Sequence, residues 1–242
     1  RLDMLSLNID TKDTHILEVL RIIQLCDSNF PIGSFNHSYG METYLRDDRV
    51  HNTDTFAKWL TTYLTKQFIY SDGMCIKMLY ELLDKKDFKG ILDLDRKITV
   101  QTIAKESRNG NKLVASRMIK MFLELYNCEE IRVYEHDIKN KKAFGHPSIV
   151  FGMLMYSLNF TVKEAIIYYI YSTISTLIQN AVRTIPLGQK DGQILLKKFI
   201  EILEELYEII NRTEYDYFGV SIPGIELSQT NHETLTFRLF MS

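Results

Sequence analysis

The sequence contains few of the residues that interrupt or cross-link a chain. Its 242 residues include only 4 prolines and 11 glycines, which favours long helices over many short strands. The three cysteines, Cys26, Cys75 and Cys128, are an odd number without C-x-x-C spacing. This pattern argues against a disulfide framework and against a thiolate zinc site, and it fits a reducing, cytoplasmic environment.

An excess of charge is also missing. Lys and Arg number 29 against 31 for Asp and Glu, so the formal net charge of −2 provides no basic field for nucleic acid or anionic lipid. The most apolar window, residues 165–178, is closed by Gln179, Asn180 and Arg183. A membrane span needs about 20 predominantly apolar residues, so this window predicts a buried core helix. We therefore expect a soluble protein without nucleic-acid or membrane partners.

Helical periodicity is present along most of the chain. Apolar residues predict a first helix near residues 16–25, and Asn52, Thr53 and Asp54 are candidate caps for a second. The second helix carries apolar residues at spacings of three and four, with a possible break at Gly73. Further helices are predicted over residues 91–104, 112–126, 131–139 and 148–158.

The second half of the chain has its own boundary signals. Thr161 and Glu164 form a Thr-x-x-Glu capping-box pattern before the most apolar helix. The spacing over 195–209 predicts one last long helix, and 212–242 lacks periodicity. We expect a single all-α, bundle-like domain over residues 1–242, with about eight to ten helices. Residues 1–13 are expected to be a flexible N-terminus, and 212–242 an irregular C-terminal docking tail.

No catalytic or cofactor site is predicted. Residues 188–193 (GQKDGQ) lack the Gly-Lys-Ser/Thr core of a phosphate loop and predict a turn in which Asp191 caps the next helix. The six histidines form no H-x-x-x-H pair, so no metal site is expected. Ser34, His37, Ser38 and Glu42 lie close in sequence without a nucleophile elbow, and Ser34 is expected to cap a helix.

Two aromatic residues and one arginine are candidates for partner contacts. Phe35 and Tyr39 lie four residues apart and would share one face of a helix, either in the core or as an anchor for a protein partner. Arg238 lies in the apolar stretch 235–241, which is unusual for a disordered tail. This stretch is expected to dock within the chain or on another one, with Arg238 able to make bidentate contacts to a partner carboxylate.

Three segments together resemble the UreF family of urease accessory proteins. They are residues 30–42 (FPIGSFNHSYGME), residues 180–189 (NAVRTIPLGQ) followed by the Asp-Gly-Gln of 191–193, and residues 232–242 (HETLTFRLFMS). They occur in the family's order, and the resemblance extends over about residues 16–242. Each segment alone is moderately specific, and the three together are a strong signal.

The resemblance implies a cytoplasmic, all-α, non-enzymatic protein that forms a homodimer. Proteins of this family act in urease maturation, in which nickel is delivered to a carbamylated-lysine active site. They bridge a GTPase, UreG, and a second scaffold, UreD (called UreH in some organisms), before the assembly meets apo-urease. The roles described for them include timing the GTPase and providing part of an internal nickel route.

The resemblance also implies three partner-binding residues. Phe35, Arg183 and Arg238 match family positions implicated in holding the GTPase. Phe35 occupies a position where some members have tyrosine. Arg183 stands where some have lysine, which keeps the charge but not the geometry. No cofactor is implied for this chain.

Two other functions are alternatives to an adaptor. One is a helical metal-dependent hydrolase in which His37 acts with distant ligands. The other is a GTPase-activating protein that uses Arg183 or Arg238 as an arginine finger.

Overall fold

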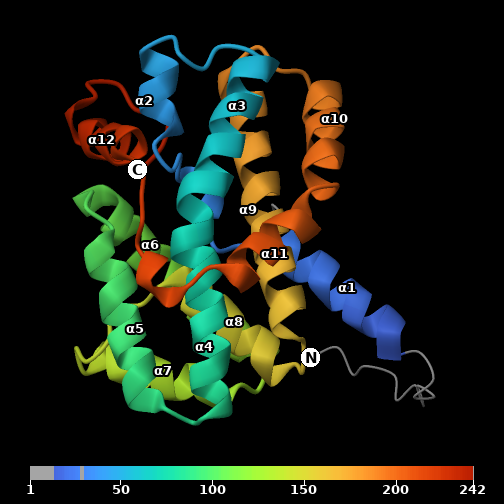
Figure 1. Ribbon diagram of the computed structural model, residues 1–242, viewed down its shortest axis with the longest axis vertical. Coiled ribbons are helices and arrows are strands. Elements are labelled where there is room, and N and C mark those ends of the chain that lie inside the picture. Colours follow the sequence, from blue (N-terminus) through green and yellow to red (C-terminus); the bar gives the residue numbers. More distant parts are fainter. Residues whose placement is uncertain (1–13, 28–29, 242) are drawn as a thin grey trace, which may run out of the picture.

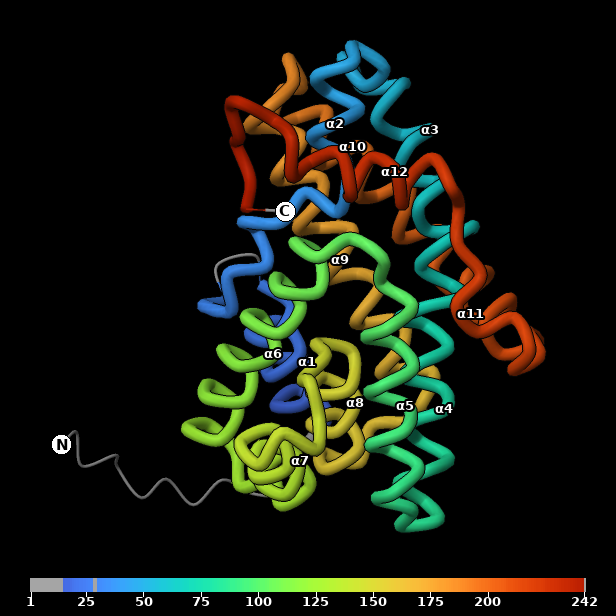
Figure 2. Tube along the Cα trace, turned by 90° about the vertical axis from the view of Figure 1, so that its left-hand side faces the viewer, coloured from blue at the N-terminus to red at the C-terminus, as the bar shows by residue number. Residues whose placement is uncertain are grey.

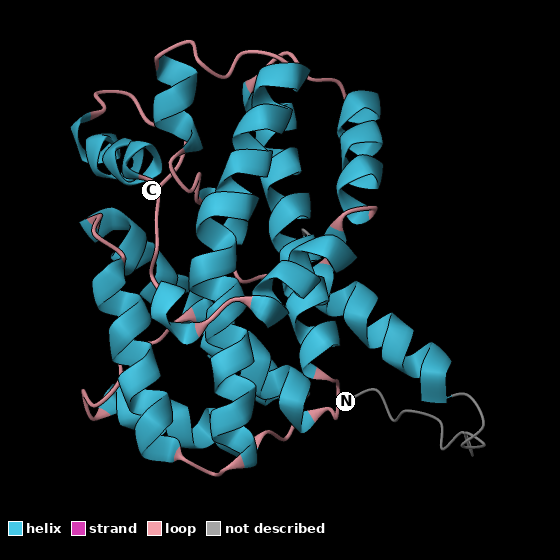
Figure 3. Cartoon of the chain, in the orientation of Figure 1, coloured by secondary structure: helices cyan, strands magenta, loops and turns pink. Residues whose placement is uncertain are grey.

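The computed structural model describes residues 14–27 and 30–241, and every regular element within them is a helix (Figure 3). The predicted all-α class is therefore confirmed. The N-terminal stretch 1–13, predicted to be flexible, lies outside the described residues.

The α-helices are α1 (Thr14–Cys26), α2 (Met41–Arg46), α3 (Thr53–Tyr63), α4 (Met74–Asp84), α5 (Phe88–Gln101), α6 (Lys105–Leu125), α7 (Glu129–Lys139), α8 (Pro147–Ser157), α9 (Val162–Thr184), α10 (Gln189–Ile200), α11 (Leu203–Arg212) and α12 (Pro223–Asn231). Short 3₁₀ turns occupy Ser34–Asn36, Tyr215–Tyr217 and His232–Thr234, and a π-helical segment, Leu64–Gly73, joins α3 to α4. Within the described ranges, no helix is long and apolar enough to cross a membrane.

Helices α8 and α9 form the centre of the molecule. Every residue of α8 from Pro147 to Met155 is buried, because this helix is apolar on all sides. Helix α9 packs against α8, α10, α11 and α1, and α1 projects from the body beside it (Figure 1). One cluster of buried side chains draws residues from each of the helices α1 to α12.

The predicted break at Gly73 is not found, because the chain continues from α3 to α4 through the π-helical segment. A Cβ atom at Gly73 would lie 2.5 Å from Cδ1 of Ile210. Glycine here lets α11 approach closely, and packing rather than helix termination explains it.

Two further boundary predictions are wrong. The single helix expected over 195–209 is divided into α10 and α11, with Ile202 between them in a non-helical conformation. The region 212–242, expected to be irregular, contains α12, with Pro223 in its first turn. Irregular structure is confined to its shorter stretches, including the terminal segment 235–241, which lies against α2 and the chain just before it (Figure 2).

Local capping chemistry agrees with the sequence at two helix starts and disagrees at two others. Asn52 caps α3, and Thr161 with Glu164 forms the predicted capping box of α9. Glycines hold the cap positions expected for Ser34 and Asp191. Gly33 precedes the first 3₁₀ turn with a φ of 75°, and Gly188 precedes α10, so both polar residues lie inside their first turns.

The capping box of α9 provides a stability test. Thr161→Ala removes the acceptor of the Glu164 amide, whose distance to the Thr161 hydroxyl is 3.3 Å. We expect unfolding in urea to require about 1 kcal/mol less free energy. Thr61→Ala, in the exposed interior of α3, is the control and should leave stability unchanged or slightly higher because alanine favours helix. Equal losses in both variants would contradict the capping role.

Candidate functional site

The three segments that carry the family resemblance converge on one face of the molecule. Residues 30–42 lead into α2, residues 180–193 span the end of α9 and the start of α10, and residues 232–241 lie beside α2 (Figure 1). Met241 of the third segment is hydrogen-bonded through its backbone amide to the carbonyl of Asn36 in the first. The Asn180 side chain donates a 3.0 Å hydrogen bond to the carbonyl of His37, which joins the first two segments.

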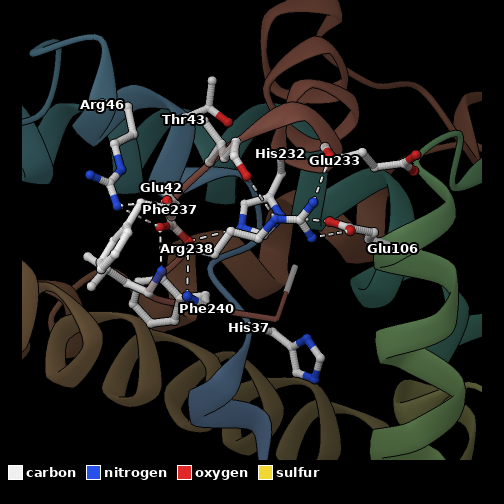
Figure 4. A network of polar contacts seen from close by, with 12 residues as sticks. His37, Glu42, Thr43, Arg46, Glu106, His232, Glu233, Phe237, Arg238 and Phe240 are labelled. Atoms are coloured by element: carbon white, nitrogen blue, oxygen red, sulfur yellow. Dashed lines mark hydrogen bonds and ion pairs between the residues drawn. The ribbon is translucent and has the colours of Figure 1, made fainter.

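Glu42 joins the first segment to the third. Its side chain is fully buried, and its carboxyl oxygens accept hydrogen bonds from the backbone amides of Leu239 at 2.6 Å and Phe240 at 3.0 Å (Figure 4). The Arg46 guanidinium, one turn further along α2, lies 3.5 Å from the same carboxyl group. The C-terminal segment therefore uses a side chain of α2 as its hydrogen-bond acceptor.

A tight turn before α2 places Glu42 in this position. Gly40 has a φ of 91°, a conformation that favours glycine. A Cβ atom there would also lie 2.5 Å from the Ser228 hydroxyl of α12. Beside it, the Thr43 hydroxyl donates a 2.6 Å hydrogen bond to the carbonyl of Ser228. These contacts bring α2 against α12 and turn Glu42 toward the third segment.

His232 connects Glu42 to α6. Its fully buried ring has Nε2 2.9 Å from Glu42 and Nδ1 2.7 Å from Glu106. Burial alone would raise the pKa of Glu106, but hydrogen bonds with His232 and Arg238 outweigh it and hold that pKa below its ordinary value. Glu106 is thus a polar anchor shared by two residues of the C-terminal region.

Arg238 is bonded within its own chain. Its Nη1 atom lies 2.5 Å from Glu106, and Nη2 donates to the carbonyl of Glu233 at 2.6 Å. Its Nε atom donates to the carbonyl of Leu235 at 3.2 Å. Of the two docking modes expected for this stretch, the structure contains the one within the chain, and the Arg238 side chain remains 36% exposed.

Phe35 and Arg183, two of the predicted partner-binding residues, contact each other. The Arg183 guanidinium lies 5.6 Å from the centre of the Phe35 ring, and it also contacts the Asn180 side chain. Both Phe35 and Arg183 are exposed. The predicted helical face of Phe35 with Tyr39 is wrong, because the 3₁₀ turn ends at Asn36 and the Tyr39 ring packs against Tyr63 instead.

The nearby Ser and His residues do not assemble a nucleophilic site. Glu42 faces His232 and the terminal segment, and Ser38 is fully buried. Burial, together with the charges of Arg117 and His232, lowers the pKa of His37 to about 4. In the part of the chain that the structure describes, no three His, Cys, Asp or Glu side chains are arranged to hold a metal ion.

The sequence contains Glu42 and His232 within the recognised segments, but nothing in the spacing indicates that they meet. Glu106, which completes the network, lies in the first turn of α6 without any sequence signal. The structure therefore adds Glu42, His232 and Glu106 to the predicted set of Phe35, Arg183 and Arg238.

Comparison with known proteins gives a consistent result. The UreF family model matches residues 50–200. The urease accessory protein UreF of Streptococcus salivarius is 41% identical over 225 residues, which cover 93% of this chain and 95% of that protein. Its counterpart in Lachnoclostridium phytofermentans is 39% identical over 224 residues, covering 93% and 98%. That of Streptococcus thermophilus is 41% identical, again over 93% and 95%.

The fold and the site define a class of protein: it is all-helical, and a polar network holds its C-terminal segment against the body. The matches cover most of the chain at about 40% sequence identity, and they identify its family. The chain belongs to the UreF family.

The role of Glu42 as an anchor can be tested by a nearly isosteric change. Glu42→Gln replaces one acceptor oxygen by a donor that faces a buried N–H group, so we expect a loss of at least about 2 kcal/mol in the free energy of unfolding. Glu233→Gln, an exposed position in the same region, should change stability by less than about 0.5 kcal/mol. Urea unfolding of both variants measures the difference, and similar small effects would contradict the anchoring role.

Proposed function

We infer that this chain is a non-catalytic urease accessory protein that bridges a UreG-type GTPase and a UreD- or UreH-type scaffold during nickel insertion into apo-urease, in the cytoplasm. Membership of the UreF family supports the accessory role. The convergence of the three recognised segments on one face is the observation that carries the finer proposal, because it provides a single surface for a protein partner.

The chemistry of this surface fits protein recognition. Phe35 and Arg183 form an exposed aromatic–cation pair, and Arg46 lies 6.0 Å from the centre of the exposed Phe237 ring. Aromatic and arginine side chains provide a large share of the binding energy in protein interfaces. We assign the GTPase to this face, with Phe35, Arg183 and Arg238 as its partner-binding residues.

The GTPase assignment is tested with Arg183→Ala. Arg183 is exposed but donates to the buried Asn180 side chain, so we expect a variant that is slightly less stable but still folded at the assay temperature. Its complex with the purified GTPase and scaffold should be at least tenfold weaker, about 1.4 kcal/mol. Arg132→Ala, an exposed arginine on α7, is the matched control and should bind as the unaltered chain does. Binding is measured by isothermal titration calorimetry, and equal affinities for both variants would refute the assignment.

Rates of GTP hydrolysis, measured with the GTPase saturated by each variant, address the alternative of a GTPase-activating protein. An arginine finger contributes on the order of 10³-fold or more to the rate of GTP hydrolysis. If Arg183 or Arg238 acted in this way, its alanine variant would lose that acceleration even when the complex is saturated. Under the adaptor proposal, the hydrolysis rate at saturation differs little between variants.

A homodimer is the second part of the proposal, and the projecting helix α1 supports it. Ile16, Leu20 and Ile23 on α1 are each more than half exposed. A groove of about 520 Å³ lies beside them between α1, α9 and α10, with Ile167 and Leu196 in its walls. Exposed apolar surface of this kind is usually covered by a partner, and we assign it to a second copy of the chain.

Analytical ultracentrifugation at tens of micromolar should therefore show a dimer. Ile23→Glu should shift the protein toward monomer, because it places a charge on the apolar face of α1. Val100→Glu, an equally exposed apolar position on α5, serves as the control and should leave the dimer intact. A monomeric unaltered protein, or dissociation by both variants, would count against dimerisation through α1.

A further inference from the structure

A groove of about 240 Å³ lies between the turn after α2, one face of α3 and the start of α12. The turn is at the upper end of the molecule, where α2 leads into α3 (Figure 1). The lining combines three buried side chains, Val50, Trp59 and Ile225, with two exposed cations, Arg49 and Lys58. Sites for drug-sized ligands occupy about 300–1,000 Å³, so this smaller groove has room for roughly one amino-acid residue.

A tight turn places Arg49 in the wall of the groove. Asp48, after the end of α2, has a φ of 57°. The backbone amides of Arg49 and Val50 donate to the carbonyl of Tyr44 at 2.9 and 3.2 Å, which reverses the chain. The Arg49 guanidinium then lies 5.9 Å from the centre of the Tyr44 ring. Local backbone geometry therefore holds this cation beside an aromatic wall.

Helix α3 provides the opposite wall. Thr55, Lys58, Trp59 and Thr62 are spaced three and four residues apart, so they share one face of the helix. Both hydroxyl groups already donate within the chain, that of Thr55 to the carbonyl of Asn52 and that of Thr62 to the carbonyl of Lys58. The donors that remain on this face are the Lys58 ammonium and the Trp59 indole N–H group.

The groove has donors in excess of acceptors. Trp59 is 6% exposed, and its indole nitrogen has no hydrogen-bond partner in the described part of the chain. A buried indole N–H group usually has an acceptor. Arg49 has only a 4.0 Å contact with Asp47, and both of these side chains are exposed. None of the described residues that line the groove is acidic. These features indicate that an anion is the missing occupant.

We propose that this groove binds the C-terminal residue of another protein chain. The terminal carboxylate would lie between Arg49 and Lys58, within reach of the Trp59 N–H group, and an apolar side chain would cover Val50 and Ile225. A guanidinium group can bind a carboxylate through two parallel hydrogen bonds. Capture of a chain terminus by a preformed donor set is a known mode of peptide recognition.

The size and polarity of the groove favour a chain terminus over other anions. A C-terminal residue carries an apolar side chain and a carboxylate together, so it fills a one-residue groove with both. An inorganic anion would leave the apolar part of the lining exposed to water and gain nothing from it. This inference is independent of the proposed GTPase and scaffold assignments, because it concerns a different surface.

The single tryptophan of the chain makes binding directly measurable. An acetylated Ala-Ala-Leu peptide with a free carboxyl terminus is titrated into the full chain while the tryptophan emission is recorded. We expect a saturable change with a dissociation constant of about 1 mM or tighter. The same peptide with an amidated terminus should bind at least tenfold more weakly, because it lacks the charge. Equal binding of the two peptides would overturn the proposal.

Variants locate the carboxylate. Arg49→Gln and Lys58→Gln should each weaken binding of the free-acid peptide at least threefold, with unchanged melting temperatures because both side chains are exposed. Lys66→Gln, an exposed lysine in the π-helical segment, is the matched control and should bind normally. Trp59→Phe keeps an aromatic ring but removes the N–H group, so its affinity, measured by calorimetry, should also fall. Normal affinity in the Arg49 and Lys58 variants would refute the site.

A third peptide tests whether the occupant is a chain terminus. Acetylated Ala-Glu-Leu with an amidated terminus carries its carboxylate on a side chain instead. If the groove is built for a C-terminal residue, this peptide should bind at least fivefold more weakly than the free-acid peptide. Binding as tight as that of the free acid would mean that an internal acidic residue is the occupant, and the proposed terminus would be wrong.

Discussion

The backbone amide of Leu239 has its hydrogen-bond acceptor in Glu42, 197 residues earlier in the chain. The amide of Phe240 uses the same buried carboxyl group. A buried N–H group without an acceptor costs about 1–3 kcal/mol, so the end of the chain can lie against the body only where such an acceptor is provided. His232 and Arg46 contact the same carboxyl group, which therefore fixes α2, the turn after α12 and the terminal segment relative to one another.

The parts of the fold that depend on neighbouring residues could be predicted from the sequence. The capping boxes at Asn52 and Thr161 require only residues three positions apart, and the amphipathic stripes of α3 and α5 require only one helix face. The division between α10 and α11 could not be predicted, because the apolar spacing continues through Ile202. The close approach of α11 to Gly73 is a tertiary contact that no local pattern records. Pro223, by contrast, was an available signal for the start of α12.

The sequence predicts several residues of the candidate site, but it does not predict which of them contact one another. Phe35 and Arg183 were expected to bind a partner, and the structure brings them into contact although they belong to different segments. Arg238 is a cation in an apolar stretch, and its contact with Glu106 lies within the chain rather than on a partner carboxylate. Glu106 itself is one of many acidic residues on helices, and only the tertiary structure distinguishes it.

The polar contacts also decide which side of the terminal segment faces outward. Apolar burial alone would favour turning Phe237, Leu239 and Met241 toward the body, because these three side chains offer more apolar area than Phe240 alone. Glu42 and the carbonyl of Asn36 oppose such a turn, since they bind the consecutive backbone amides of residues 239–241. Hydrogen bonds to Glu42 and Asn36 thus hold Phe240 against the body while Phe237, Leu239 and Met241 stay exposed.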